Sequence, residues 1–142
     1  MWWKLQIEVE WLSDEKKAWD ATDCLYAYLH PKTDEILFIG SAFTRTVREG
    51  FDAPEKVDLF EYFDAIHRLN PSEVKIAVGE VWLDEGRHLT RELLTDVESV
   101  LVKRVQPPGN IQRKVKKISR PGVIVKCTGE WPHERKMFID SE

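Results

Sequence analysis

Hydrophobic and polar residues alternate near the start of the chain, over residues 3–11, with the period of two that is typical of a β-strand. Charged or polar residues separate the apolar ones, which are Trp3, Leu5, Ile7, Val9 and Trp11. We therefore expect a strand with one face in the core and the other in solvent. Residues 12–23 are polar and predict a connection that contains a helical turn.

Two further hydrophobic stretches, residues 24–30 and 35–40, flank the sequence Pro-Lys-Thr-Asp. Proline and aspartate favour a tight turn, so this pattern predicts a β-hairpin. We expect Gly40 and Ser41 to end the second strand. A helix should then begin within residues 42–51 and end near Gly50.

Two later segments have apolar residues at helical spacing. Residues 54–71 start with a proline, continue with acidic residues and close before a second proline, which predicts one helix. Residues 89–105 predict an amphipathic helix capped at or near Thr90. Between them, residues 73–82 predict a strand in which Gly79 marks a bulge.

The predicted elements form one α+β domain over residues 1–142. We expect a small antiparallel or mixed sheet flanked by helices. The strand at residues 3–11 is an addition at its N-terminal side, and a basic segment with a late strand at 122–127 follows at its C-terminal side.

Composition places the chain among ordinary globular proteins, with 42% hydrophobic and 32% charged residues. No apolar run approaches the ~20 residues needed to cross a bilayer, and the acidic start does not resemble a secretory signal. We therefore expect a soluble, cytoplasmic protein with no membrane partner. Cys24 and Cys127 lie far apart in apolar segments, which favours two reduced core thiols over a disulfide or a metal site.

Charge is distributed unevenly along the chain. The net charge is −4, yet residues 99–129 contain no Asp or Glu and eight Lys or Arg residues, whereas the remainder carries 13 basic and 25 acidic residues. A basic segment of this size favours contact with a phosphate backbone. A solvated surface is the alternative interpretation for any short run of charge.

Four short motifs resemble those of the GIY-YIG nuclease family in their order and in the elements that carry them. Cys-Leu-Tyr ends at Tyr26 on the first hairpin strand, and Phe-Ile-Gly ends at Gly40 on the second. Arg48 follows eight residues after that glycine, and the fourth motif runs from Glu98, inside the long helix, to Asn110, which closes a Pro-Pro-Gly-Asn sequence. Each motif alone is common, but their occurrence in order is more specific.

The resemblance covers residues from about 24 to 110 and implies a divalent-metal-dependent endonuclease acting on DNA, or on RNA. It implies that Tyr26 deprotonates the attacking water, with Tyr28 able to share or replace that role, and that Arg48 forks onto the phosphate oxygens. Glu98 would hold one Mg²⁺ or Mn²⁺ ion together with water molecules. A half-buried strand tyrosine and a solvent-facing glutamate are the structural alternatives for Tyr26 and Glu98.

The resemblance also implies a set of residues around the substrate. Gly40, Ser41 and Arg45 would line the substrate side, and Asn110 would brace the ends of the motifs. The basic C-terminal segment is expected to follow the nucleic-acid backbone through Lys114, Lys116, Lys117 and Arg120.

Two positions depart from the family pattern and keep other functions open. Phe38 stands where the second motif has a tyrosine, and Asp52 stands where a histidine is common. These departures support a second hypothesis, a catalytically inactive module that binds nucleic acid on the same fold. A third hypothesis is a protein-interaction domain, because the six tryptophans suit interfaces as well as cores. A nuclease of this size would also rely on other proteins for targeting.

Overall fold

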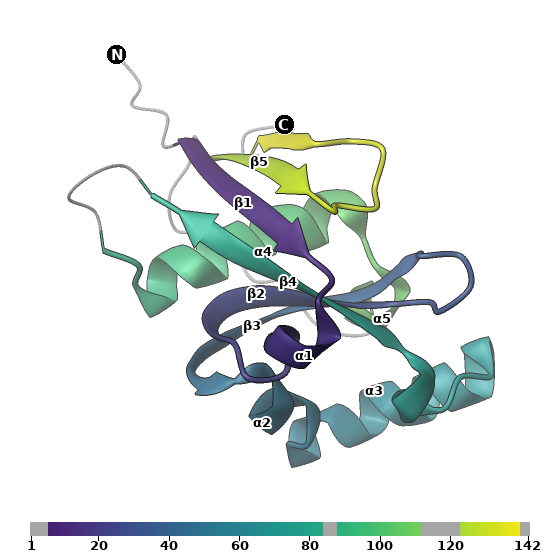
Figure 1. Cartoon of the computed structure of the whole chain (residues 1–142). Helices are drawn as coiled ribbons and strands as arrows, with labels where there is room; N and C mark the ends of the chain where they lie inside the picture. The colour runs from purple at the N-terminus through teal and green to yellow at the C-terminus, as the bar shows by residue number, and fades with distance from the viewer. Residues whose placement is uncertain (1–5, 84–87, 112–122, 140–142) are drawn as a thin grey trace.

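The computed structural model describes residues 6–83, 88–111 and 123–139. Within these residues six strands form one mixed sheet in the order β3-β2-β4-β1-β5-β6 (Figure 1). β1 and β5 are parallel, and every other neighbouring pair is antiparallel. The strands are β1 (Gln6–Leu12), β2 (Thr22–Leu29), β3 (Ile36–Thr46), β4 (Lys75–Trp82), β5 (Ile124–Gly129) and β6 (Met137–Ile139).

Helices cover parts of both faces of this sheet (Figure 1). α4 packs across one face, and the shorter helices of the N-terminal half pack on the other face around the β2–β3 hairpin. The α-helices are α1 (Glu15–Ala18), α2 (Val47–Phe51), α3 (Val57–Tyr62), α4 (Arg91–Val105) and α5 (Pro108–Ile111). Two 3-10 turns, η1 (Pro54–Lys56) and η3 (Pro71–Glu73), and a π-helical turn, η2 (Phe63–His67), complete the described elements.

The alternation at the start of the chain is confirmed for residues 6–12 and places β1 inside the sheet. Ile7, Val9 and Trp11 are fully buried against the α4 face, whereas Gln6 and Glu8 are exposed. β1 pairs with β4 on one side and with β5 on the other. The N-terminal strand is therefore central to the sheet, because both of its edges are used in hydrogen bonding.

The helix expected within residues 42–51 is shorter than the sequence pattern suggested. β3 continues past Gly40 to Thr46, where Thr22 of β2 pairs with it, and only Val47–Phe51 is helical. A capping box explains the boundary: the Thr46 side chain accepts from the Glu49 backbone N–H, and the Glu49 carboxylate accepts from the Thr46 N–H. The helix thus starts five residues after the beginning of the segment expected to be helical.

The single helix expected over residues 54–71 is a succession of short helical segments. η1, α3 and η2 follow one another, and the run closes at Arg68, which has the left-handed backbone φ of 54°. Asn70 is extended, as a residue before proline prefers, and its side chain accepts a hydrogen bond from the Ser72 N–H. The second proline therefore starts a new turn, η3, and does not merely follow the helix.

Gly79 lies in a regular strand, so the predicted bulge is wrong. The pairing of β4 with β1 and with β2 is continuous through this residue. A Cβ atom at Gly79 would lie 2.7 Å from Val9 Cγ1 and 3.0 Å from the Trp11 ring. The glycine is required because two large side chains of β1 occupy the space above it.

Other predicted features agree with the structure. The α+β class is confirmed, the long helix begins after Thr90, and the Thr90 hydroxyl accepts from the Leu93 N–H. Cys24 and Cys127 are free, and burial raises the pKa of each thiol to about 12. No helix among the described residues is long and apolar enough to span a membrane.

Candidate functional site

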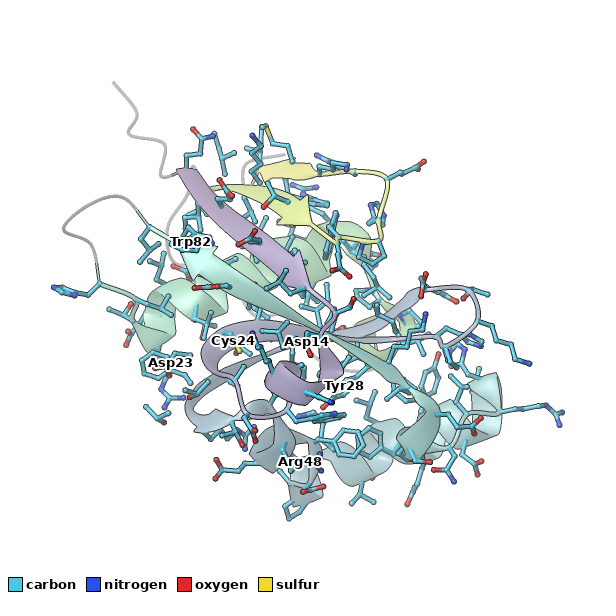
Figure 2. All side chains as sticks on the ribbon, viewed as in Figure 1. Asp14, Asp23, Cys24, Tyr28, Arg48 and Trp82 are labelled. Carbon is cyan, nitrogen blue, oxygen red and sulfur yellow. The ribbon has the colours of Figure 1, made fainter. Side chains whose placement is uncertain are left out.

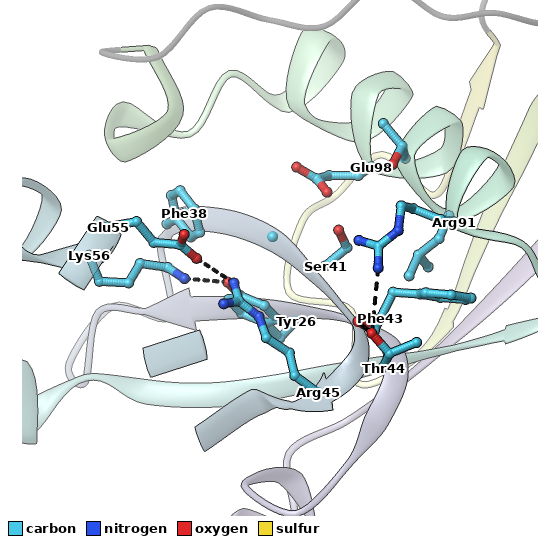
Figure 3. Close-up of a pocket in the computed structure, with 13 residues that line it drawn as sticks. Tyr26, Phe38, Ser41, Phe43, Thr44, Arg45, Glu55, Lys56, Arg91 and Glu98 are labelled. Atoms are coloured by element: carbon cyan, nitrogen blue, oxygen red, sulfur yellow. Dashed lines mark hydrogen bonds and ion pairs between the residues drawn. The ribbon is translucent and has the colours of Figure 1, made fainter. Parts of the chain in front are cut away.

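A cavity of about 520 Å³ opens beside the edge strand β3, between α4 and the η1 turn (Figure 3). Residues of β2, β3, η1 and α4 line it, so four separated parts of the chain contribute to one site. The lining includes five residues that the motif resemblance singled out: Tyr26, Gly40, Ser41, Arg45 and Glu98.

Tyr26 and Gly40 face each other directly across the hairpin. The two residues are paired in the β2–β3 register, and a Cβ atom at Gly40 would lie 2.6 Å from both the Cζ and the Oη of Tyr26. The absence of a side chain at Gly40 therefore leaves room for the phenol to cross the edge strand. Tyr26 is otherwise buried, with 2% of its surface exposed, so its polar end is the part that meets the cavity.

Lys56 approaches the same phenol from the end of η1. Its ammonium group donates to Tyr26 Oη at 2.7 Å and to the Gly50 carbonyl at 3.1 Å, and only 2% of the residue is exposed. The Nζ atom lies 5.2 Å from the Tyr26 ring centroid and 5.6 Å from that of Phe38. The aromatic faces and the phenol oxygen thus compensate for the burial of a positive charge.

The electrostatic environment keeps Tyr26 protonated in neutral solution. Burial raises the pKa of the Tyr26 phenol above its usual range, and the Glu98 carboxylate raises it further. A hydrogen bond with Tyr28 and the positive charge of Arg45 lower this pKa to a smaller extent. Because burial dominates, the phenol is the major form of Tyr26 near pH 7.

The arginine at the cavity is Arg45, and Arg48 lies elsewhere. Arg45 is on β3, lines the cavity and forms an ion pair with Glu55 of η1. Arg48 is exposed on α2 (Figure 2). Its guanidinium lies 4.9 Å from the Trp19 ring centroid. Arg48, which the resemblance places at the phosphate, thus lies apart from this cavity: since β3 extends to Thr46, the next turn of chain carries Arg48 past it.

Glu98 reaches the cavity from α4, as its helical position suggested. Arg91, Leu94, Thr95 and Glu98 all line the cavity and recur at the three- and four-residue spacing of one helix face. The described residues contain no group of three or more His, Cys, Asp or Glu that could hold a metal ion. Two of the described glutamates line the cavity, Glu98 and the Glu55 that pairs with Arg45. Mg²⁺ commonly binds through one or two carboxylates plus water and substrate phosphate, and this open cavity fits only that form of site.

Asn110 supports the strand without lining the cavity. Its side chain accepts from the Ile39 N–H at 2.8 Å and donates to the Ile39 carbonyl at 2.9 Å. These are the backbone groups that an edge strand leaves unpaired. The buried amide thus completes the hydrogen bonding of β3 one residue before Gly40.

The remaining residues expected at the site lie outside the cavity or outside the described chain. Tyr28 is fully buried among aromatic rings, with Phe38 stacked at 5.5 Å and Phe51 edge-on at 5.8 Å. Asp52 is the C-cap residue of α2. Lys114, Lys116, Lys117 and Arg120 fall outside the described residues.

Sequence reasoning missed two cations at the cavity, Lys56 and Arg91. Lys56 follows a proline and a glutamate in a polar turn, a pattern that indicates a surface lysine, so the sequence carried no signal for it. For Arg91 the sequence did carry a signal, because this residue lies two helical turns before Glu98 and shares its helix face.

No protein-family model, no curated protein and no solved structure matches this chain.

Proposed function

We propose that this chain is a metal-dependent endonuclease of the GIY-YIG type that hydrolyses phosphodiester bonds in DNA or RNA. The observation that carries the proposal is the convergence of Tyr26, Arg45, Lys56 and Glu98 on one open cavity. Phosphodiester hydrolysis requires a group that takes a proton from water, positive charge near the phosphate oxygens and stabilisation of the leaving oxygen. A phenol, two cations and a carboxylate provide groups for these tasks.

Arg45 is the residue proposed to bind the phosphate. Its guanidinium is partly exposed at the cavity, and the ion pair with Glu55 holds it in place. A guanidinium presents parallel N–H donors that match two phosphate oxygens, which an ammonium group does not. Arg45 can therefore orient the phosphate as well as attract it.

Tyr26 is the proposed proton acceptor, in its phenolate form. Water transfers its proton to the phenolate oxygen while the water oxygen forms the new bond to phosphorus. The bond between phosphorus and the leaving oxygen breaks, and that oxygen takes a proton from solvent. The ammonium of Lys56, 2.7 Å from Tyr26 Oη, favours the phenolate over the phenol by its charge. Burial and Glu98 oppose this effect, so only a minor fraction of Tyr26 is competent at neutral pH.

Glu98 is the residue that would hold a divalent cation, and such a cation, when bound, supplies charge stabilisation to the phosphate and leaving oxygens. The negative charge of Glu98 is also one of the two main causes of the raised Tyr26 pKa. Because Glu98 lies on the cavity wall, it affects both the binding of the cation and the protonation of Tyr26.

The test is cleavage of supercoiled, linear and branched DNA with Mg²⁺ or Mn²⁺. Glu98→Gln should abolish metal-dependent cleavage, because an amide keeps the shape of the side chain but loses its charge. Glu92→Gln is the matched control, since Glu92 is exposed on the same helix and does not line the cavity. Equal cleavage by the wild type and both variants would exclude Glu98 as the metal ligand.

A nucleic-acid-binding module without catalysis is the second candidate function, and two observations favour it. Phe38 lines the cavity where a second tyrosine would carry a hydroxyl, and the pKa of Tyr26 is raised. This function predicts salt-dependent binding of DNA with no cleavage at any pH or with either metal. Binding without cleavage would therefore replace the endonuclease by the module.

A further inference from the structure

Arg91 is a cation of the cavity with no role in the chemistry described above. It is the first residue of α4 and lines the cavity on the same helix face as Glu98, two turns before it. Figure 3 shows Arg91 at one end of the cavity, beside Thr44 and Phe43, with Lys56 and Glu55 at the other end.

Within the described part of the chain, the guanidinium of Arg91 contacts two neutral side chains. It lies 5.1 Å from the Phe43 ring centroid, and its Nη2 donates to Thr44 Oγ1 at 3.4 Å. Across the described ranges of the chain, Arg91 has no carboxylate within ion-pair distance, whereas Arg45 is paired with Glu55. Arg91 thus retains most of its donors for a ligand.

The support under Arg91 is built from strained backbone. Thr44 has a φ of 62° and Asp23 has a φ of 55°, both in the left-handed region, which is costly for a β-branched residue such as threonine. The Asp23 carboxylate accepts from the Thr44 N–H at 2.9 Å, at the irregularity where the β2–β3 register shifts. The contacts of Arg91 with Phe43 and Thr44 join this end of β3 to the start of α4.

Helix stability does not account for an arginine at this position. A positive side chain in the first turn of a helix meets the positive end of the helix dipole, which is unfavourable. No ion pair in the described residues offsets that effect at Arg91. An anionic ligand at the cavity would offset it.

We propose that Arg91 binds the backbone phosphate adjacent to the one held by Arg45, so that the cavity takes two consecutive phosphates of a polynucleotide. The inference rests on the proposed function, because it names the substrate of the same site. The size of the cavity, about 520 Å³, supports it, since this is the range of cavities that hold molecules far larger than one phosphate group. Arg45 and Arg91 each bind one of the two phosphates, and Glu98 lines the cavity from α4.

The test is the salt dependence of binding to a fluorescent 20-base-pair DNA duplex, measured by anisotropy without divalent metal. Each phosphate contact contributes about 0.9 to the slope of log K against log salt for a duplex. Arg91→Ala should reduce that slope by about one contact and weaken binding irrespective of sequence. Arg91→Lys should keep the slope, because it keeps the charge.

Arg48→Ala is the matched control. Arg48 is also an exposed arginine over an aromatic ring, Trp19, but it does not line the cavity. Its substitution should leave the slope at the wild-type value. Thermal unfolding of each variant shows that the comparison is made between folded proteins.

The outcomes separate the inference from the proposed function. If Arg91→Ala keeps the wild-type slope while Glu98→Gln abolishes cleavage, the second phosphate anchor is excluded and the endonuclease stands. If Arg91→Ala and Arg48→Ala reduce the slope equally, the effect is general electrostatics and the anchor is also excluded. If the wild type neither binds nor cleaves nucleic acid, both proposals fail.

Discussion

At the scale of single residues, the Tyr26 phenol is subject to opposing charges. The ammonium of Lys56 donates to its oxygen, while burial and the Glu98 carboxylate raise its pKa. When the pKa of a phenol lies above the working pH, most of the population is protonated and cannot accept a proton. The minor phenolate population is nevertheless a strong base. The balance among Lys56, Glu98 and Tyr26 therefore determines how much reactive phenolate exists at a given pH.

This balance predicts the pH dependence of cleavage. Because the pKa of Tyr26 is raised, the phenolate fraction, and with it the rate, should rise about tenfold per pH unit between pH 6 and 9. Lys56→Met removes the charge that favours the phenolate, so the profile should move to higher pH and cleavage at pH 8 should fall roughly tenfold or more. Initial rates across this pH range measure both effects.

Lys17→Met is the control for this prediction, because Lys17 is an exposed lysine on α1. Its profile should superimpose on that of the wild type. A Lys56→Met profile that does the same would show that Lys56 only fills space beside Tyr26. Methionine suits the buried site in size, so loss of the fold is not expected to obscure the result.

At the scale of elements, β3 determines which side chains meet the cavity. Gly40 admits the phenol, Phe43 and Thr44 support Arg91, and Arg45 lines the cavity, all from one edge strand. An edge strand has unpaired backbone groups, and the Asn110 side chain occupies two of them. The position of Asn110, shortly after α4, therefore limits where β3 can lie.

Asn110→Ala should destabilise the fold, because it leaves the Ile39 N–H and carbonyl without their partner. An unsatisfied buried group costs about 1–3 kcal/mol, so the free energy of unfolding should fall by at least that amount. Asn70→Ala is the comparison, since Asn70 is exposed and caps a short turn; its loss should cost only about 1 kcal/mol. Urea unfolding gives both values, and equal losses would contradict the bracing role.

The same strand shows where prediction from the sequence ends. The hairpin and its turn follow from local patterns that the structure repeats, whereas the pairing of Tyr26 with Gly40 depends on a register irregularity between Tyr28 and Leu29. The end of β3 does not follow from such patterns either, because residues 42–46 suit a helix start as well as a bulged strand. That difference of a few residues decides that Arg45, and not Arg48, lines the cavity.

At the scale of the whole molecule, the candidate site depends on contacts between segments that are distant in the sequence. Tyr26 and Glu98 could be singled out because each belongs to a motif with its own spacing. The sequence carried no signal for Lys56, and Arg91 shares a helix face with Glu98; whether either cation meets the cavity depends on how η1 and α4 approach the hairpin. Long-range packing, which local patterns do not encode, therefore supplies two of the three cations named at the cavity.

The distribution of charge predicts that surface carboxylates far from the cavity affect DNA affinity. Glu8 on β1 and Glu80 on β4 are exposed on the sheet, and β2 separates their strands from β3 and the cavity. Glu8→Gln with Glu80→Gln changes the net charge from −4 to −2. Repulsion of a polyanion should decrease, so DNA affinity at 50 mM salt should rise roughly two- to threefold, while the cleavage rate of bound DNA stays unchanged.

Salt identifies the origin of this effect. Screening shortens the range of exposed charges from about 10 Å at 0.1 M to about 3 Å at 1 M, so the affinities of the double variant and the wild type should converge at high salt. Anisotropy titrations at several salt concentrations measure this directly. An affinity gain that persists at high salt would mean that the open face of β1 and β4 contacts the nucleic acid itself, and that the cavity at β3 is not its only binding surface among the described residues.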